Sequence, residues 1–158
     1  MTALLSHAAA DYGDRYREHL FEQYKLYVDS ADRISQRRSS ANSFLLTVNA
    51  ALVTLYGLTT PLKPAGAAAW HLLVPVAGIL VCIAWVSLVE NYRSLNSVKF
   101  KLVHELEKQL PASLYGYEWE LLERGEGKVY KPVTHIEQWI PFVFILLYVG
   151  LVLYSFLG

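Results

Sequence analysis

Cysteine and net charge are both scarce in this chain, and each shortage excludes a class of protein. Its 158 residues include one cysteine, Cys82, so no disulfide can form within one chain. The 14 basic residues are balanced by 14 acidic ones, so no broadly basic surface for nucleic acid is expected. Charged residues make up 18% of the chain, against about 25% in soluble proteins, and 54% of the residues are hydrophobic. These values predict that much of the surface faces lipid.

Recognisable catalytic and cofactor motifs are also missing. The sequence contains no P-loop, no H-E-x-x-H zinc motif and no G-x-S-x-G nucleophile motif, and its glycines are scattered. His104 and Glu107 have a spacing that can ligate a metal, but the chain has too few cysteines to complete a tetrahedral set. We therefore expect no enzyme, no catalytic residue, no cofactor and no metal site.

Long apolar runs are abundant, and they predict membrane spans at 41–60, 70–90 and 136–157. Each run has about 20 residues, which is enough for a helix to cross about 30 Å of hydrocarbon. The first run is the weakest because it contains Asn42, Asn49, Thr47 and Thr54. The alternative is a soluble helical core, but so small a chain would have little left to cover three such helices. We predict an all-α membrane protein with three transmembrane helices, the first two extended into the cytoplasm as long helices.

The distribution of basic residues predicts the orientation of these spans. Six lysines and arginines lie in 1–40 and seven in 91–135, whereas the link between the first two spans holds only Lys63. Basic residues concentrate on the cytoplasmic side of membrane proteins. The N-terminus and segment 91–135 are therefore predicted to be cytoplasmic, and the 61–69 link and the C-terminus are predicted to face outward.

Segment 1–40 is predicted to be a cytoplasmic amphipathic helix that continues into the first span. Nothing breaks a helix from Asp14 to Tyr56. Upstream of the membrane, apolar residues recur at alternating spacings of four and three, which forms a heptad seam. The members of this seam are Leu20, Tyr24, Tyr27, Ala31 and Ile34. Such a seam needs a partner helix.

Segment 91–135 is predicted to be a cytoplasmic helical segment with a loop. The second helix is expected to continue to Leu110, where Pro111 stops it, and to pair with the first helix along its length. Its apolar positions are expected to lie mostly on one face, namely Leu95, Val98, Leu102, Val103, Leu106 and Leu110. A short helix at 115–122 and an extended return at 128–136 are expected to follow.

Asn42, Asn49 and Thr54 are the candidate residues for an oligomer interface or a pore lining. Asn42 and Asn49 are seven residues apart and therefore share a helix face. Amides in hydrocarbon bind partners on another helix, with a gain on the order of 1 kcal/mol. These residues either hold helices or subunits together or line an ion pathway, and in a ring of subunits the two roles can coexist.

Arg37, Arg38, Glu90 and Arg93 are the candidate ion-pairing residues at the inner membrane boundary. Glu90 and Arg93 are one helical turn apart, so they can pair with each other or with the two arginines of the first helix. Such pairs either fix the depth of the helices in the membrane or take part in gating.

Three stretches carry a resemblance to a known family, namely "FEQYKLYVDSADRISQRRSSANSFLLTVNAAL", "ENYRSLNSVKFKLVHELEKQLPASLYGYEWELL" and "THIEQWIP". Together they span roughly residues 20 to 145. The chain resembles the RipA-like family of small bacterial inner-membrane proteins, which are described as octameric. The resemblance implies a homo-oligomer in the cytoplasmic membrane, and it implies no catalytic residues. The layout is also similar to small membrane effectors of bacterial nucleotide-signalling and anti-phage systems, a likeness of architecture alone.

These observations predict a homo-oligomeric inner-membrane protein that forms a ring-like assembly, either a pore or a channel-like scaffold. The partners are then the lipid bilayer and further copies of the same chain. Two alternatives are a membrane-disrupting effector triggered through its cytoplasmic segment and an accessory subunit that docks a cytosolic protein partner.

Overall fold

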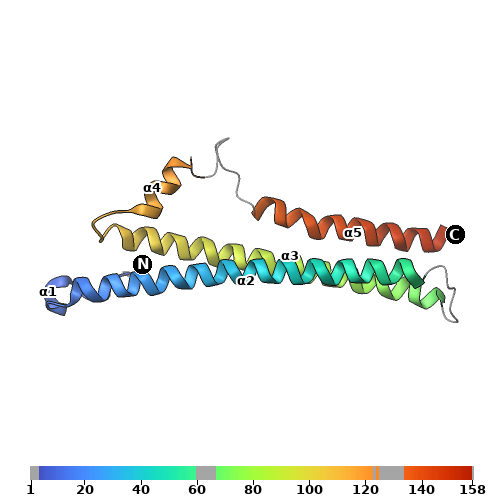
Figure 1. The fold of residues 1–158 in the computed structure, drawn as a ribbon, viewed down its shortest axis with the longest axis horizontal. Helices are drawn as coiled ribbons and strands as arrows, with labels where there is room; N and C mark the ends of the chain where they lie inside the picture. The colour runs from blue at the N-terminus through green and yellow to red at the C-terminus, as the bar shows by residue number, and fades with distance from the viewer. Residues whose placement is uncertain (1–3, 60–66, 123, 125–133, 158) are drawn as a thin grey trace.

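A computed structural model describes residues 4–59, 67–122, 124 and 134–157, and Figure 1 shows their arrangement. Within these residues 89% are helical and none belongs to a strand. The helices are α1 (Ala9–Tyr12), α2 (Tyr16–Thr59), α3 (Ala67–Glu107), α4 (Leu114–Leu121) and α5 (Thr134–Leu157). The predicted all-α fold with three long apolar helices is confirmed.

α2 and α3 form an antiparallel hairpin along the long axis of the molecule (Figure 1). Side-chain hydrogen bonds join the two helices at every level. In order along α2, these are Tyr24–Glu107, Ser30–Lys99, Asn42–Trp85, Asn49–Cys82 and Thr59–Trp70. Residue numbers fall along α3 as they rise along α2, which is what antiparallel pairing requires.

α5 packs against the membrane half of α3 and runs antiparallel to it (Figure 1). α3 is therefore the central helix, and a larger share of its span is buried than of either other span. Trp85 and Tyr148 are almost fully buried between them. Gly78 permits this approach, because a Cβ on it would overlap the ring of Tyr148.

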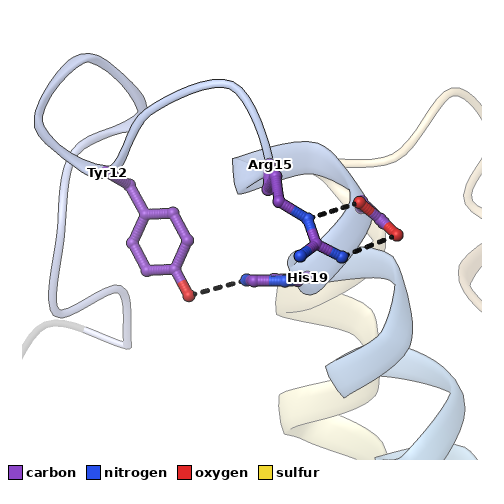
Figure 2. A network of polar contacts seen from close by, with 4 residues as sticks. Tyr12, Arg15 and His19 are labelled. Atoms are coloured by element: carbon purple, nitrogen blue, oxygen red, sulfur yellow. Dashed lines mark hydrogen bonds and ion pairs between the residues drawn. The ribbon is translucent and has the colours of Figure 1, made fainter.

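The start of α2 is fixed by a tight turn and two local contacts (Figure 2). The chain turns through Gly13, whose φ of 96° is one that residues with a Cβ rarely adopt. The Tyr12 hydroxyl lies 2.9 Å from Nδ1 of His19, and Nε of Arg15 donates a 3.0 Å hydrogen bond to Glu18. The bond from Arg15 lowers the pKa of Glu18. A carboxylate in the first turn also suits the positive end of the helix dipole.

Several sequence predictions for the hairpin are confirmed. α2 is one unbroken helix of 44 residues, and the seam residues Leu20 and Ala31 are buried. α4 begins one residue before the short helix that was predicted. Residues 128–133 of the predicted extended return lie outside the described residues, and its last three residues, 134–136, are not extended because they form the first turn of α5.

Two details of the α3 prediction are wrong. The helix ends at Glu107 rather than Leu110, because the backbone then tightens into turns in which Gln109 and Leu110 donate to the carbonyls three residues back. Leu95 and Val98 are exposed, because the face of α3 that packs in this region is centred on other residues. Those residues are Val89, Asn96, Lys99, Val103 and Leu106.

Candidate functional site

Asn49 is the centre of a hydrogen-bond network that joins all three spanning helices. Its side chain is 0% exposed. Nδ2 donates to the Leu45 carbonyl at 2.8 Å, while Oδ1 accepts from the Cys82 thiol at 3.2 Å and the Tyr148 hydroxyl at 3.1 Å. The Tyr148 hydroxyl also lies 3.3 Å from the Asn49 carbonyl oxygen. The amide therefore links α2 to α3 and to α5 inside a single chain.

Asn42 lies on the same face of α2 and also bonds to α3. Its Oδ1 accepts a 2.9 Å hydrogen bond from the indole N–H of Trp85. Its Nδ2 is buried and has no partner among the described residues. The shared face expected for the two asparagines is thus the face that packs on α3. A role in an oligomer interface or a pore lining stays a prediction for both.

Thr54 lies away from that face. Its side chain is exposed in the single chain, and its hydroxyl donates to the Ala50 carbonyl at 2.8 Å. Thr47 makes the same type of bond to the Ser43 carbonyl at 2.9 Å. Because these hydroxyls are satisfied by their own helix, they can face lipid, a neighbouring subunit or water.

Two of the four predicted boundary residues, Arg38 and Arg93, connect α2 and α3 to the start of α5. Nε of Arg38 lies 3.6 Å from the Glu137 carboxylate, and both side chains are largely buried. Arg93 donates a 3.4 Å hydrogen bond to Gln138. Glu90 and Arg37 are exposed. The structure thus brings Arg38 and Arg93 to α5. A role for Glu90 and Arg37 in boundary ion pairs stays a prediction.

Glu107 is a buried carboxylate whose role sequence reasoning missed. It is 0% exposed, and its Oε1 accepts hydrogen bonds from the Tyr24 hydroxyl at 3.0 Å and the Tyr115 N–H at 2.9 Å. Its Oε2 accepts from the Gly116 N–H at 3.0 Å. Burial raises the pKa of Tyr24 to about 12, and the hydrogen bond to Glu107 acts in the same direction. We call Tyr24, Glu107, Tyr115 and Gly116 the Glu107 clasp.

The clasp satisfies a requirement of helix ends. The first N–H groups of a helix have no acceptor within the helix, and a carboxylate is favoured there. The N-cap residue Ser113 makes no side-chain capping bond to α4, so Glu107 serves in its place. The available signal was an acidic residue just before the Pro111 break, followed at once by a new helix. Among the described residues, no group of three His, Cys, Asp or Glu side chains is arranged to hold a metal.

Fold and polar contacts together define an all-α membrane protein whose three spanning helices are joined inside the bilayer by amide and hydroxyl groups. Three of the described helices are long and apolar enough to cross a membrane. The chain belongs to the octameric membrane protein family (8xMP), whose family model matches residues 21–157. The predicted resemblance to an octameric membrane protein family is thereby confirmed. No curated protein and no solved structure matched the chain.

Proposed function

We propose that the protein forms a ring-like homo-octamer in the bacterial inner membrane and acts as a channel-like scaffold. The observation that carries this proposal is an exposed stripe of small residues on the membrane half of α2. The stripe consists of Ser43, Thr47, Ala50, Thr54 and Gly57. Its spacings of four and three place all five residues on one face, which none of the described helices covers.

Small residues let two membrane helices approach closely, and such faces are enriched at helix–helix contacts in lipid. The hydroxyls of Thr47 and Thr54 bond to their own helix, so close packing leaves neither of these hydroxyls unsatisfied. Asn49, in contrast, has its bonds inside the chain. The stripe is therefore the better candidate for contacts between subunits or for the surface that faces the axis.

A contact between two different faces of the same chain can repeat from one subunit to the next. The repeated contact forms a closed ring when the rotation between neighbouring subunits brings the last subunit back to the first. Eight membrane subunits around one axis enclose a central space, and this supports a channel-like scaffold. The basic residues support an inner-membrane orientation with 1–40 and 91–135 in the cytoplasm. The spans proposed within the longer helices are 41–60, 70–90 and 136–157.

The stripe is tested by Ala50→Leu, with Ala51→Leu as the matched control. Ala51 is also exposed and lies at the same depth, but it neighbours the bulky exposed residues Phe44, Leu55 and Leu58. Native mass spectrometry in detergent is expected to show octamers for the wild type and Ala51→Leu and smaller species for Ala50→Leu. Octamers of equal stability for both variants would contradict the role of the stripe.

The channel part is tested separately with intact octamers in planar lipid bilayers. Discrete conductance steps are expected for the wild-type octamer. Intact octamers without conductance would mean a closed scaffold.

An accessory role is the second candidate, because α4 exposes an apolar face. Leu114, Tyr117 and Leu121 are all more than 60% exposed and follow one another at spacings of three and four. A cytosolic protein partner that packs on this face would be lost with Tyr117→Asp while the octamer remains. No described feature favours the membrane-disrupting effector, which would be tested by loss of membrane potential on expression.

A further inference from the structure

A basic cavity of about 590 Å³ lies between α2, α3 and α4, beside the start of α5. Its cationic lining comes from two helices: Arg38 belongs to α2, and Arg93, Lys101 and His104 belong to α3. α4 closes the third side with aromatic and acidic side chains, including Trp119 and Glu118. Its volume falls within the range of about 300–1,000 Å³ that is typical of small-ligand sites.

The charge balance of this cavity favours an anion. Glu118 is the only carboxylate among its lining residues, whereas three lining residues carry a permanent positive charge. Glu137 lies 3.6 Å from Arg38 and offsets part of that charge. Arg93 makes one long bond to the neutral Gln138, and Lys101 forms no ion pair with the described residues. Within the described part of the chain, the charges of Arg93 and Lys101 are therefore incompletely neutralised.

A buried polar atom gives a second, independent indication of a ligand. Oδ1 of Asn96, a lining residue, is buried and has no hydrogen-bond partner among the described residues. Buried acceptors without a partner are rare and costly, and an absent ligand is one way to explain them. A molecule that carries hydroxyl groups beside its anionic group would satisfy the cations and this acceptor together.

The cavity extends from the membrane boundary into the cytoplasmic part of the hairpin. Arg38 and Arg93 each lie three residues from the proposed spans. His104 lies further along α3 by 11 residues, or roughly 16 Å of helix. The arginine end is thus at the level of lipid phosphates, and the other end is at the level of the cytosol.

We propose that this cavity binds a phosphate group, with Arg38, Arg93 and Lys101 as its ligands. Arginine pairs are suited to phosphate because the planar guanidinium donates two parallel hydrogen bonds. The phosphate belongs either to the headgroup of an anionic lipid or to a small soluble molecule. The site lies within one protomer, so it depends neither on a central pore nor on the stripe.

Two binding assays on the purified octamer distinguish these sources. In the first, native mass spectrometry counts phosphatidylglycerol molecules that remain bound after exchange against excess phosphatidylcholine. In the second, thermal unfolding in nanodiscs of phosphatidylcholine alone is followed as inorganic pyrophosphate is added. Retained phosphatidylglycerol assigns the site to a lipid headgroup, and stabilisation by pyrophosphate assigns it to a soluble phosphate compound.

Matched variants show whether the binding belongs to this cavity. Arg93→Gln and Lys101→Gln are expected to weaken binding about five- to tenfold each, as the loss of one cation near a phosphate predicts. Arg37→Gln and Lys108→Gln remove the same residue types outside the cavity and are expected to bind as the wild type does. Lys101→Gln breaks no ion pair in the described residues, and its unfolding midpoint without ligand is expected to equal that of the wild type, which separates lost binding from lost folding. The proposal is overturned if neither probe binds or if the control variants weaken binding equally.

Discussion

Asn49 illustrates how one polar residue can organise the membrane part of this protein. An unpartnered amide in hydrocarbon costs several kcal/mol, on the order of 2 to 7, so it favours the arrangement that satisfies it. In this chain that arrangement brings Cys82 of α3 and Tyr148 of α5 to the same oxygen. The amide thereby selects one packing of three helices whose other contacts are mostly apolar.

The first prediction concerns this network. Asn49→Leu is expected to lower the free energy of unfolding by about 1–3 kcal/mol, because the Tyr148 hydroxyl and Cys82 lose their acceptor in a buried site. Tyr148→Phe should cost less, about 0.6–1 kcal/mol. Ser87→Ala on α3, at an exposed position whose hydroxyl bonds to the Ile83 carbonyl of its own helix, is the control and should change little. Unfolding in detergent by denaturant titration measures all three, and an unchanged Asn49→Leu protein would contradict the assignment.

Gly78 provides a second prediction at the residue scale. In Gly78→Ala the new methyl group would overlap the Tyr148 ring, so α3 and α5 must separate or the ring must move. Overpacking of this kind costs about 1–3 kcal/mol. Gly150→Ala on α5 is the control, because a Cβ there meets nothing within 4 Å in the chain. Thermal unfolding should show a lower midpoint for Gly78→Ala alone, and equal midpoints would exclude the close contact.

At the scale of elements, the hairpin and α4 are joined by the Glu107 clasp. α2, α3 and α4 meet at one buried carboxylate, which accepts from a tyrosine and from two backbone N–H groups. α4 has eight residues and is too short to be stable by itself. Its position therefore depends on Glu107 and on the aromatic contact between Tyr115 and Phe100.

The clasp predicts an alkaline transition. The pKa of Tyr24 is raised to about 12 from its ordinary value of about 10, so its protonated form is favoured in the folded state. The associated stability is present below pH 10 and is lost as the pH rises from 10 to 12. Tyr24→Phe should flatten the stability profile in this window, whereas Tyr117→Phe on exposed α4 surface should not. Thermal unfolding of the wild type and Tyr24→Phe across this pH range measures the effect. Identical pH profiles of these two proteins would contradict the role of the clasp.

A second prediction at the scale of elements concerns the negative charge of Glu107. Glu107→Gln keeps the shape but weakens the bonds to the N-terminal N–H groups of α4, because a neutral acceptor is poorer there. We expect faster hydrogen exchange at Tyr115 and Gly116 with little change in the membrane spans. Equal exchange in both proteins would show that α4 is held without this carboxylate.

At the scale of the whole molecule, the single chain leaves most of its apolar surface uncovered. Only α3 is flanked on two sides by helices of the same chain, and the spans of α2 and α5 are mostly exposed. Lipid covers part of such a surface, and membership of an octameric family supports neighbouring subunits as the cover of the rest. The stripe on α2 is the candidate for contacts between subunits, and the apolar face of α4 is the candidate for a cytosolic protein partner.

The proposed orientation gives a prediction for the intact molecule. In a Cys82→Ala background, Lys63→Cys should react with a membrane-impermeant maleimide added to spheroplasts, because the link between the first two spans faces the periplasm. Arg17→Cys should react only after permeabilisation. The reverse pattern would contradict the orientation, while leaving the three spans intact.

The sequence by itself determined the class of fold, because span length, apolar composition and the heptad seam are local properties of the chain. It also paired α2 with α3, since two long helices joined by a short link can cover each other only as an antiparallel hairpin. Only the tertiary structure decided that Asn49 bonds within one chain, that Arg38 meets Glu137 and that Glu107 caps α4. Asn49 and Arg38 meet partners that lie far away in the sequence, and Glu107 meets α4 only through the turns that follow α3. The rotation of each helix about its own axis, set by packing around Gly78 and Tyr148, decides which side chains meet.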